Sequence, residues 1–371
     1  MAGVAHGDWK ECAPLPQALA RASAAHILWP GDEGMVVASG GLTAVGSTTD
    51  AIWGYEVSRD QWRRIGRLAT PRCNHASVAL ANHRVLVIGG QSATNLRFSG
   101  GLRSTEFIEA ATGRSIPGPD LPAGMRSPTA HLMPDGSVVA IGGDMAAVMD
   151  RPLGHGARWR GIPLRESRHE HASVVLDDRR VAVVGGQGTG SIEVVGGGAS
   201  VMRKARLPDA LDDHRVWRLP DGRLWVLGGQ LTFRGRTTDQ TWVVDLDGAR
   251  VIPGPALGHA PGVADAGLWV SGEGSTAWLA GGESDEGGDD RELRRAWRLV
   301  LGDGGLRVER GPDLPGPVDD AAWAVLPGGE AVSVGGVVTR RLLGRSLPTP
   351  VSRVVRYVRA GRGEVAEAAG E

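Results

Sequence analysis

The chain has 371 residues, of which 57 are glycine and 41% are hydrophobic, and its formal net charge is −1. The hydrophobic fraction excludes collagen-like and disordered chains, and the lack of basic excess argues against a general binder of nucleic acid or of anionic membranes. Two cysteines, Cys12 and Cys73, cannot form a disulfide framework. Because there is no secretory-type start and no apolar stretch of membrane-spanning length, we expect a soluble cytoplasmic monomer.

A short apolar run that ends in two glycines recurs seven times along the chain. The first glycines of these pairs lie 43 to 54 residues apart, at Gly40, Gly89, Gly142, Gly185, Gly228, Gly281 and Gly335. Runs that are apolar on both faces suit a strand in the middle of a sheet, and glycine lets the chain turn with positive φ. The period, near 50 residues, is typical of a radial repeat architecture.

Each glycine pair is flanked by further strand-like segments in a fixed order. An apolar segment such as 75–80 precedes it, and third and fourth segments such as 51–57 and 61–65 follow it. The pattern predicts an all-β fold, a seven-bladed β-propeller of four-stranded antiparallel blades. The blades at Gly143 and Gly186 are expected to have poor or short third strands.

The glycine pairs, a tryptophan in the outer strand and an Arg-x-x-His approach to the inner strand resemble the kelch-repeat β-propeller family. The outer-strand tryptophans are Trp9, Trp62 and Trp159, and Arg72 and His75 show the Arg-x-x-His spacing. The resemblance covers nearly the whole chain and implies a propeller that most often serves as an interaction module. It does not fix the function, because one fold hosts many activities.

The N-terminal segment is predicted to complete the last blade. Asp8 and Trp9 mimic Gln61 and Trp62 of an outer strand, so residues 7–11 would pair with the third strand at 352–358 and close the ring. A rival interpretation assigns this role to residues 364–368. We therefore expect one domain over residues 1–359 and a flexible tail over 360–371.

Polar residues just before each inner strand and just after each glycine pair should converge on a central mouth, since both positions lie at the same end of a meander. The predicted ligand-binding residues are Arg21, Arg72, Cys73, His75, Arg126, Arg168, His214, Asp265, Gln91, Gln187 and Gln230. If the protein is an enzyme, the predicted catalytic residues are His169, His171, Asp212 and Asp319.

Two columns of equivalent positions carry most of these candidates. The position sixteen residues before each first glycine holds Ala24, Cys73, Arg126, His169, Asp212, Asp265 and Asp319. Its chemistry changes from blade to blade, which favours function over scaffold. Two residues further on, histidine recurs at His75, His171 and His214, and a residue type that recurs in a repeat is more often structural.

The charges predict a mouth that is basic on one side and acidic on the other. The leading hypothesis is a module that binds a small polar, at least partly anionic ligand, a peptide or a protein through Arg72, Arg126 and Arg168. The alternative is a metal-independent acid/base isomerase, lyase or cyclase that acts on a small polar metabolite. No spacing typical of a metal, nucleotide or nucleophile site is present, so we predict no metal and no cofactor.

Overall fold

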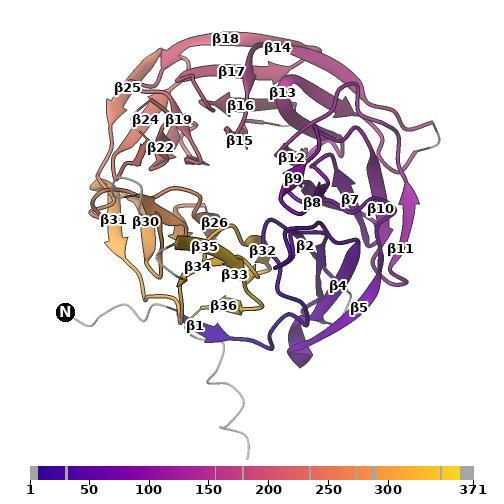
Figure 1. Ribbon diagram of the computed structural model, residues 1–371. Helices are drawn as coiled ribbons and strands as arrows, with labels where there is room; N and C mark the ends of the chain where they lie inside the picture. The colour runs from indigo at the N-terminus through magenta and orange to yellow at the C-terminus, as the bar shows by residue number, and fades with distance from the viewer. Residues whose placement is uncertain are drawn as a thin grey trace, which may run out of the picture.

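The computed structural model describes residues 7–29, 32–154, 156–177, 179–233, 235–271, 274–285, 290–342 and 345–359, and within these ranges nearly all regular secondary structure is β-strand. Among the described residues, six antiparallel sheets have four strands and two have three, and one of these two is a small sheet of Leu211–Asp212, Gln230–Leu231 and Arg236–Thr237; the seven larger sheets are numbered 1 to 7 below. They stand around a common axis, as Figure 1 shows. The described part of the chain has no helix long and apolar enough to span a bilayer. The predicted tail at 360–371 lies outside the described residues.

The first four sheets follow one another along the chain. Sheet 1 contains β2 (Ser23–Ile27), β3 (Met35–Ser39), β4 (Ala51–Glu56) and β5 (Gln61–Arg67), with a 3-10 helix η1 (Val57–Arg59) before β5. Sheet 2 contains β6 (Ala76–Leu80), β7 (Arg84–Ile88), β10 (Thr105–Glu109) and β11 (Arg114–Pro117). Sheet 3 contains β12 (Thr129–Leu132), β13 (Val138–Met149) and β14 (Arg160–Arg168). Sheet 4 contains β15 (Ala172–Val175), β16 (Arg180–Val184), β17 (Ser191–Gly196) and β18 (Ala199–Arg206).

The remaining three sheets complete the described architecture. Sheet 5 contains β20 (Arg215–Arg218), β21 (Leu224–Leu227), β24 (Thr241–Asp245) and β25 (Arg250–Pro253). Sheet 6 contains β26 (Gly267–Ser271), β27 (Thr276–Ala280), β30 (Ala296–Gly302) and β31 (Gly305–Arg310). Sheet 7 contains β32 (Ala322–Leu326), β33 (Glu330–Val334), β36 (Val354–Val358) and the N-terminal strand β1 (Asp8–Glu11).

The second strand of each sheet is buried because neighbouring sheets cover both of its faces. Every residue of β3 and of β33 is buried, which explains why these segments read as continuous apolar runs. Glycine ends such a strand because no other residue fits there: Gly229 has φ 103°, and a Cβ on it would lie 2.6 Å from the Cβ of His214.

Sheet 3 has three strands instead of four, which agrees with the expectation of a poor third strand, whereas sheet 4 does not agree with it. In sheet 3 the 12-residue β13 pairs with β12 through its first part and with β14 through its second, and it contains both Gly142 and Gly143. In sheet 4 the expectation is wrong. The six-residue β17 pairs with both β16 and β18, and its residues 191–195 are buried.

The N-terminal strand is fastened to sheet 7 by backbone pairing and by an aromatic cluster. β1 pairs antiparallel with β36, with Trp9 opposite Tyr357. The ring of Trp9 lies 5.4 Å from that of Tyr357 and 5.8 Å from that of Trp269 in sheet 6, and its Nε1 donates to the carbonyl oxygen of Pro312. The strand therefore joins sheet 7 to sheet 6.

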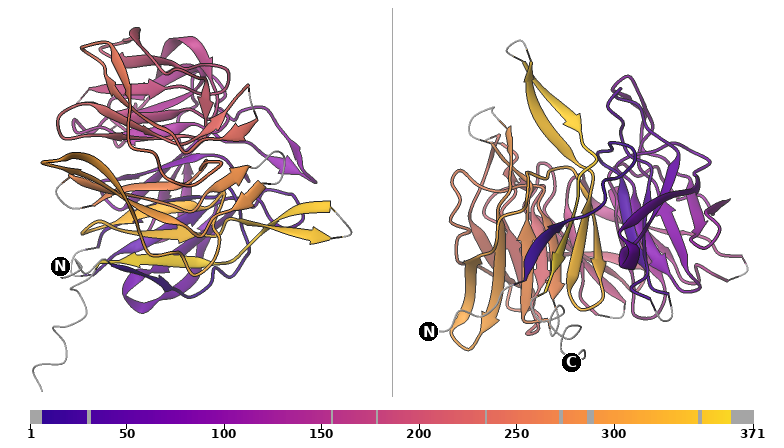
Figure 2. Two further views of the ribbon diagram at one scale, coloured as in Figure 1. Left: turned by 90° about the vertical axis from the view of Figure 1, so that its left-hand side faces the viewer. Right: turned by 90° about the horizontal axis from the view of Figure 1, so that it is seen from below.

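Small hairpins follow several glycine pairs and rise from one face of the sheets. They are β8–β9 (Ala93–Thr94 and Arg97–Phe98), β22–β23 (Gln230–Leu231 and Arg236–Thr237), β28–β29 (Glu283–Asp285 and Asp290–Glu292) and β34–β35 (Val337–Leu342 and Arg345–Pro350). The last one projects furthest in Figure 2. Hydrogen bonds join the three hairpins of sheets 5 to 7, from Asp285 N to Thr237 Oγ1 and from Thr339 N to Glu292 Oε1. We call these three linked hairpins, β22–β23, β28–β29 and β34–β35, the hairpin wall, and it stands over sheets 5 to 7.

Candidate functional site

Seven residues, one before the inner strand of each sheet, share an unusual backbone conformation. Their φ angles lie between 47° and 54°, in the left-handed region that residues other than glycine rarely adopt. They are Arg21, Asn74, Ser127, Glu170, Asp213, Asp265 and Asp320. All seven line one cavity of about 640 Å³ at the centre of the ring, and we call them the mouth residues.

Backbone hydrogen bonds between neighbouring sheets hold these positions. In one arc, Arg21 N donates to Asp320 O over 2.9 Å and Asn74 N donates to Arg21 O over 3.0 Å. In a second arc, Asp213 N donates to Glu170 O over 3.0 Å and Asp265 N donates to Asp213 O over 2.9 Å. Each amide thus uses the carbonyl of the equivalent residue in the preceding sheet, which fixes the direction of the side chains.

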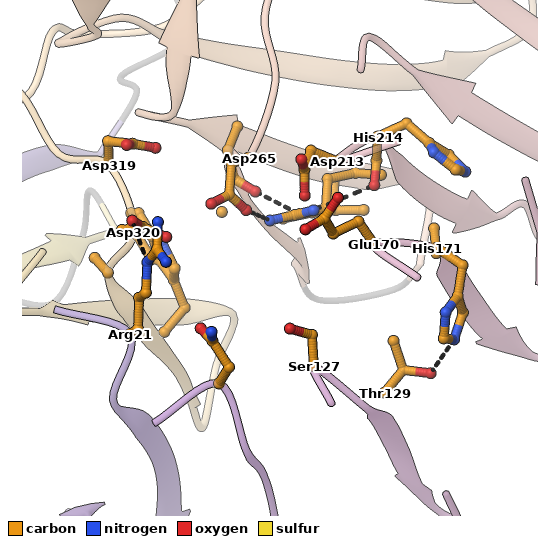
Figure 3. A pocket seen from close by; sticks show the side chains of 18 of the residues that line it. Arg21, Ser127, Thr129, Glu170, His171, Asp213, His214, Asp265, Asp319 and Asp320 are labelled. Carbon is orange, nitrogen blue, oxygen red and sulfur yellow. Dashed lines mark hydrogen bonds and ion pairs between the residues drawn. The ribbon is translucent and has the colours of Figure 1, made fainter. Parts of the chain in front are cut away.

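The cavity is predominantly acidic on one side. Its described lining includes two guanidinium groups, of Arg21 and Arg215, and six carboxyl groups, of Glu170, Asp213, Asp265, Glu283, Asp319 and Asp320. Figure 3 shows Asp265, Asp213 and Glu170 along one edge, with Arg21 and Ser127 on other edges. The acidic mouth residues belong to sheets 4 to 7, and the hairpin wall stands over the last three of these sheets.

The two guanidinium groups are paired, but several carboxyl groups are not. Arg21 Nε lies 2.8 Å from Asp320 Oδ2, and Arg215 Nη2 lies 2.6 Å from Asp265 Oδ1. Among the described residues, neither Asp213 nor Asp319 forms a salt bridge, and Asp319 Oδ1 is buried without a hydrogen-bond partner. The cavity therefore carries an excess of carboxylate.

Burial and mutual repulsion change the acidity of these carboxyls. Burial raises the pKa of Asp213 well above its usual value, and the charges of Asp265 and Glu170 raise it further. Burial also raises the pKa of Asp319, with Asp265 and Asp320 adding to the effect. The pKa of Asp320 is raised by burial despite the nearby guanidinium of Arg21. A positive group placed in the mouth would relieve this repulsion.

The predicted functional column lies one residue away from the mouth in most sheets. Cys73 pairs with Gln91 and Asp212 pairs with Gln230 through their backbones, and His169 O accepts from Gln187 N. These residues therefore join the segment before each inner strand to the segment after the glycine pair. Cys73, His169 and Asp212 do not line the cavity, whereas His171, Asp319 and Asp265 do. None of the three glutamines lines it, and Gln91 Nε2 donates to Ser99 O instead.

Arg72 and Arg168 lie inside the sheets and not in the mouth. Arg168 is 0% exposed and donates to the carbonyl oxygens of Gly185 and Ser191, to Ser191 Oγ and to Glu193 Oε1 over 2.7 to 3.2 Å. Arg72 repeats this arrangement in sheet 2. Its partners there are Gly89, Ser104 and Glu106. All their described donors face the protein interior, so they act as scaffold. Arg126 is exposed beside the mouth without lining the cavity.

The column of histidines lines the cavity but is deeply buried. His75 Nε2 lies 3.1 Å from Ser39 Oγ, and its ring rests where a Cβ on Gly40 would be; the ring of His214 rests in the same way against Gly185. Burial lowers the pKa of His75, His171 and His214 to about 3, so all three rings are neutral at pH 7. His75 and His214 therefore fill space between sheets, while His171 has different contacts.

The assigned binding and catalytic residues omit several residues that the structure brings together. Among the mouth residues, only Arg21 and Asp265 had been assigned a role. Asn74, Glu170, Asp213 and Asp320 were expected at the mouth by their place before an inner strand, and Glu283 by its place after a glycine pair, without an assigned role. Ser127 and Arg215 also line the cavity and were not expected there. The sequence does contain a signal, because the mouth residue directly precedes the column that holds His75, His171 and His214 in sheets 2, 3, 4, 5 and 7, and it is polar in every sheet. No group of three His, Cys, Asp or Glu residues suited to a metal ion occurs in the described part of the chain.

No family model and no curated protein sequence matches the chain. Solved structures do match, among them one titled "Structure of YjhT", with a TM-score of 0.57 and 12% sequence identity. The match covers 92% of this chain and 95% of that chain. At this identity the similarity concerns the fold alone, and it supports a propeller arrangement of the sheets.

Proposed function

We propose that the protein is a single-domain, kelch-type propeller of seven blades, closed by the N-terminal strand β1, that binds a small polar ligand in its central mouth. The convergence of seven left-handed polar residues on one cavity supports this proposal most strongly. The volume of about 640 Å³ is in the ordinary range for small-molecule sites.

The ligand carries a positive group, such as an ammonium, that faces the acidic side of the mouth. Asp213 and Asp319 lack salt-bridge partners among the described residues, and their raised pKa values reflect burial and carboxylate repulsion. An ammonium beside them would favour the ionised carboxylates and gain charge-assisted hydrogen bonds. This revises the expectation of an arginine-rich site, because Arg72 and Arg168 are committed to buried carboxylates.

The other side of the mouth would hold the uncharged or anionic end of the same ligand. Arg21, Asn74 and Ser127 follow one another around the ring there, and the Arg21 side chain is 40% exposed. Together the two sides fit a zwitterionic or amine- and hydroxyl-bearing molecule. The hairpin wall over sheets 5 to 7 would shield the acidic side from solvent and strengthen its charge interactions.

Native mass spectrometry of the full chain with a metabolite library, sorted into cationic, zwitterionic, neutral and anionic members, tests the proposal. We expect retention of amine-bearing members and a loss of affinity of tenfold or more in Asp213→Asn. Glu109→Gln is the matched control, because Glu109 pairs with Arg84 away from the cavity. Retention of purely anionic members, or equal affinity in both variants, would count against it.

A second function, acid/base catalysis at the same mouth, is favoured by Asp319. Its carboxyl lines the cavity, Oδ1 is buried without a partner, and burial raises its pKa, so the protonated form can serve as a proton donor. Proton NMR of each retained ligand during incubation would reveal isomerisation, elimination or ring closure. A reaction that Asp319→Asn abolishes while binding persists would establish catalysis; unchanged ligand spectra would leave binding as the function.

A further inference from the structure

A continuous chain of side-chain hydrogen bonds crosses from sheet 3 to sheet 4 beside the mouth. His131 Nε2 lies 2.7 Å from Ser173 Oγ, Ser173 Oγ donates to Thr129 Oγ1 over 2.7 Å, and Thr129 Oγ1 lies 3.0 Å from His171 Nε2. Thr129 and His131 belong to β12, Ser173 belongs to β15, and His171 directly precedes β15. Figure 3 shows the Thr129 end of this chain meeting His171 at the edge of the cavity.

The chain joins two cavities. Thr129, His171 and Ser173 line the mouth, whereas His131 lines a second cavity of about 330 Å³ among the inner strands of sheets 1, 2, 3 and 7. Trp323 lines both cavities and therefore lies at their boundary. A proton that moves along the chain would pass from one cavity to the other.

His171 differs from the other two histidines in its column. The rings of His75 and His214 rest against the first glycine of the preceding pair, at Gly40 and Gly185. The corresponding glycine before His171 is Gly142, where a Cβ would meet Met125 and Pro128 first and not a histidine ring, and His171 lies against Thr129 instead. Its Nδ1 is buried and has no hydrogen-bond partner among the described residues. The scaffold role that explains the other two histidines does not account for this arrangement.

We propose that Thr129 and Ser173 form a proton relay that couples the protonation of His171 at the mouth to that of His131 in the second cavity. The relay works with neutral rings, and burial lowers the pKa of His171 to about 3 and that of His131 to about 4. It requires one N–H on each ring and one O–H on each hydroxyl, which these four side chains provide.

The proton balance of one transfer closes. Because Ser173 donates to Thr129, the transfer runs from His131 towards His171. A proton from the second cavity adds to Nδ1 of His131, whose Nε2 proton passes to Ser173 Oγ. The Ser173 proton passes to Thr129 Oγ1, and the Thr129 proton passes to Nε2 of His171. His171 then releases its Nδ1 proton towards the mouth. One proton enters and one leaves, both histidines end as the other tautomer, and the three hydrogen bonds reverse their direction.

The test reads the ring tautomers directly in the full chain labelled with ¹⁵N-histidine. Long-range ¹H–¹⁵N spectra report whether Nδ1 or Nε2 carries the proton on each ring. We expect His131→Asn to change the Nδ1-to-Nε2 proton ratio of His171 at least threefold. In a Ser173→Ala background, His131→Asn should have no further effect, and Ser173→Thr should restore the coupling by restoring the hydroxyl.

Ser77→Ala is the matched control. Ser77 stands two residues after His75, as Ser173 stands two residues after His171, and its buried hydroxyl has no hydrogen-bond partner in the described part of the chain. The control should leave the His171 tautomer unchanged. An unchanged His171 ratio in folded His131→Asn, or an equal change in Ser77→Ala, would overturn the relay. The relay does not depend on which ligand the mouth binds, so its failure would leave the proposed binding function intact.

Discussion

Arg168, the last residue of β14, is a buried arginine bonded to Gly185, Ser191 and Glu193, and it provides a direct check on which residues are scaffold. Arg168→Met removes a guanidinium that makes five hydrogen bonds and leaves Glu193, which is 0% exposed, without its counter-charge. Breaking a buried ion pair by removing one partner costs about 3–5 kcal/mol. We expect urea denaturation to show a decrease of that size in the free energy of unfolding.

The partner variant shows where the loss comes from. Glu193 also accepts from the amides of Arg165 and Glu166, and Glu193→Gln keeps an acceptor there while it removes the charge. The double variant Arg168→Met/Glu193→Gln should therefore recover about 1 kcal/mol or more relative to Arg168→Met. Ligand affinity of the folded single variant should stay within about twofold. Loss of binding with a change in stability below 1 kcal/mol would refute the scaffold assignment.

Three further predictions concern the N-terminal strand, acid stability and the exposed arginine. Trp9→Ala should lower the free energy of unfolding by about 3–5 kcal/mol in urea denaturation, because it empties a buried aromatic site, while exposed Lys10→Ala on the same strand should change it by less than about 0.5 kcal/mol. A loss of stability below about 1 kcal/mol in Trp9→Ala would contradict the role of Trp9 in fastening β1 to sheets 6 and 7. His75 and His214 are buried and neutral, with pKa values of about 3 in the folded chain against about 6.5 in the unfolded chain. Lowering the pH from 7 to 5 should therefore reduce the free energy of unfolding by about 2 kcal/mol for each of them, because the unfolded chain takes up protons first. In urea denaturation at a series of pH values, His75→Gln should reduce this dependence of the free energy of unfolding on pH. The mouth aspartates, whose pKa values are raised, contribute in the opposite direction in both proteins. An unchanged pH dependence would contradict the burial of His75. Arg126→Ala should alter neither ligand capture nor the melting temperature, and a tenfold loss of capture would extend the mouth beyond its lining residues.

The elements of the fold followed from the sequence because their signals are local. Outside sheet 3, Gly-Gly ends each second strand because a Cβ there would collide with neighbouring atoms, and the sequence shows this requirement directly as a glycine. The pairing of residues 8–11 with β36 was anticipated from Trp9, because an isolated tryptophan beside an acidic residue repeats the pattern of Trp62. The continuous β13 was not anticipated, because its glycines look like those of the other repeats.

The site was harder to predict because side-chain direction depends on backbone turns that composition does not encode. Arg168 and Glu170 are two residues apart and would share one face of a regular strand. The φ of 54° at Glu170 breaks that alternation, so Glu170 faces the mouth while Arg168 faces the interior. Counting back from the glycines also misplaced the column, since Ala20, and not Ala24, bridges to the residue after the first pair.

A crystal structure of the complex with the most tightly retained library member tests the central claim most directly. The account predicts density inside the ring of mouth residues, with the positive group of the ligand within hydrogen-bonding distance of Asp213 or Asp319 and its opposite end toward Asn74 or Ser127. Density on the outer surface of the sheets, or an anionic group against the acidic side, would contradict it.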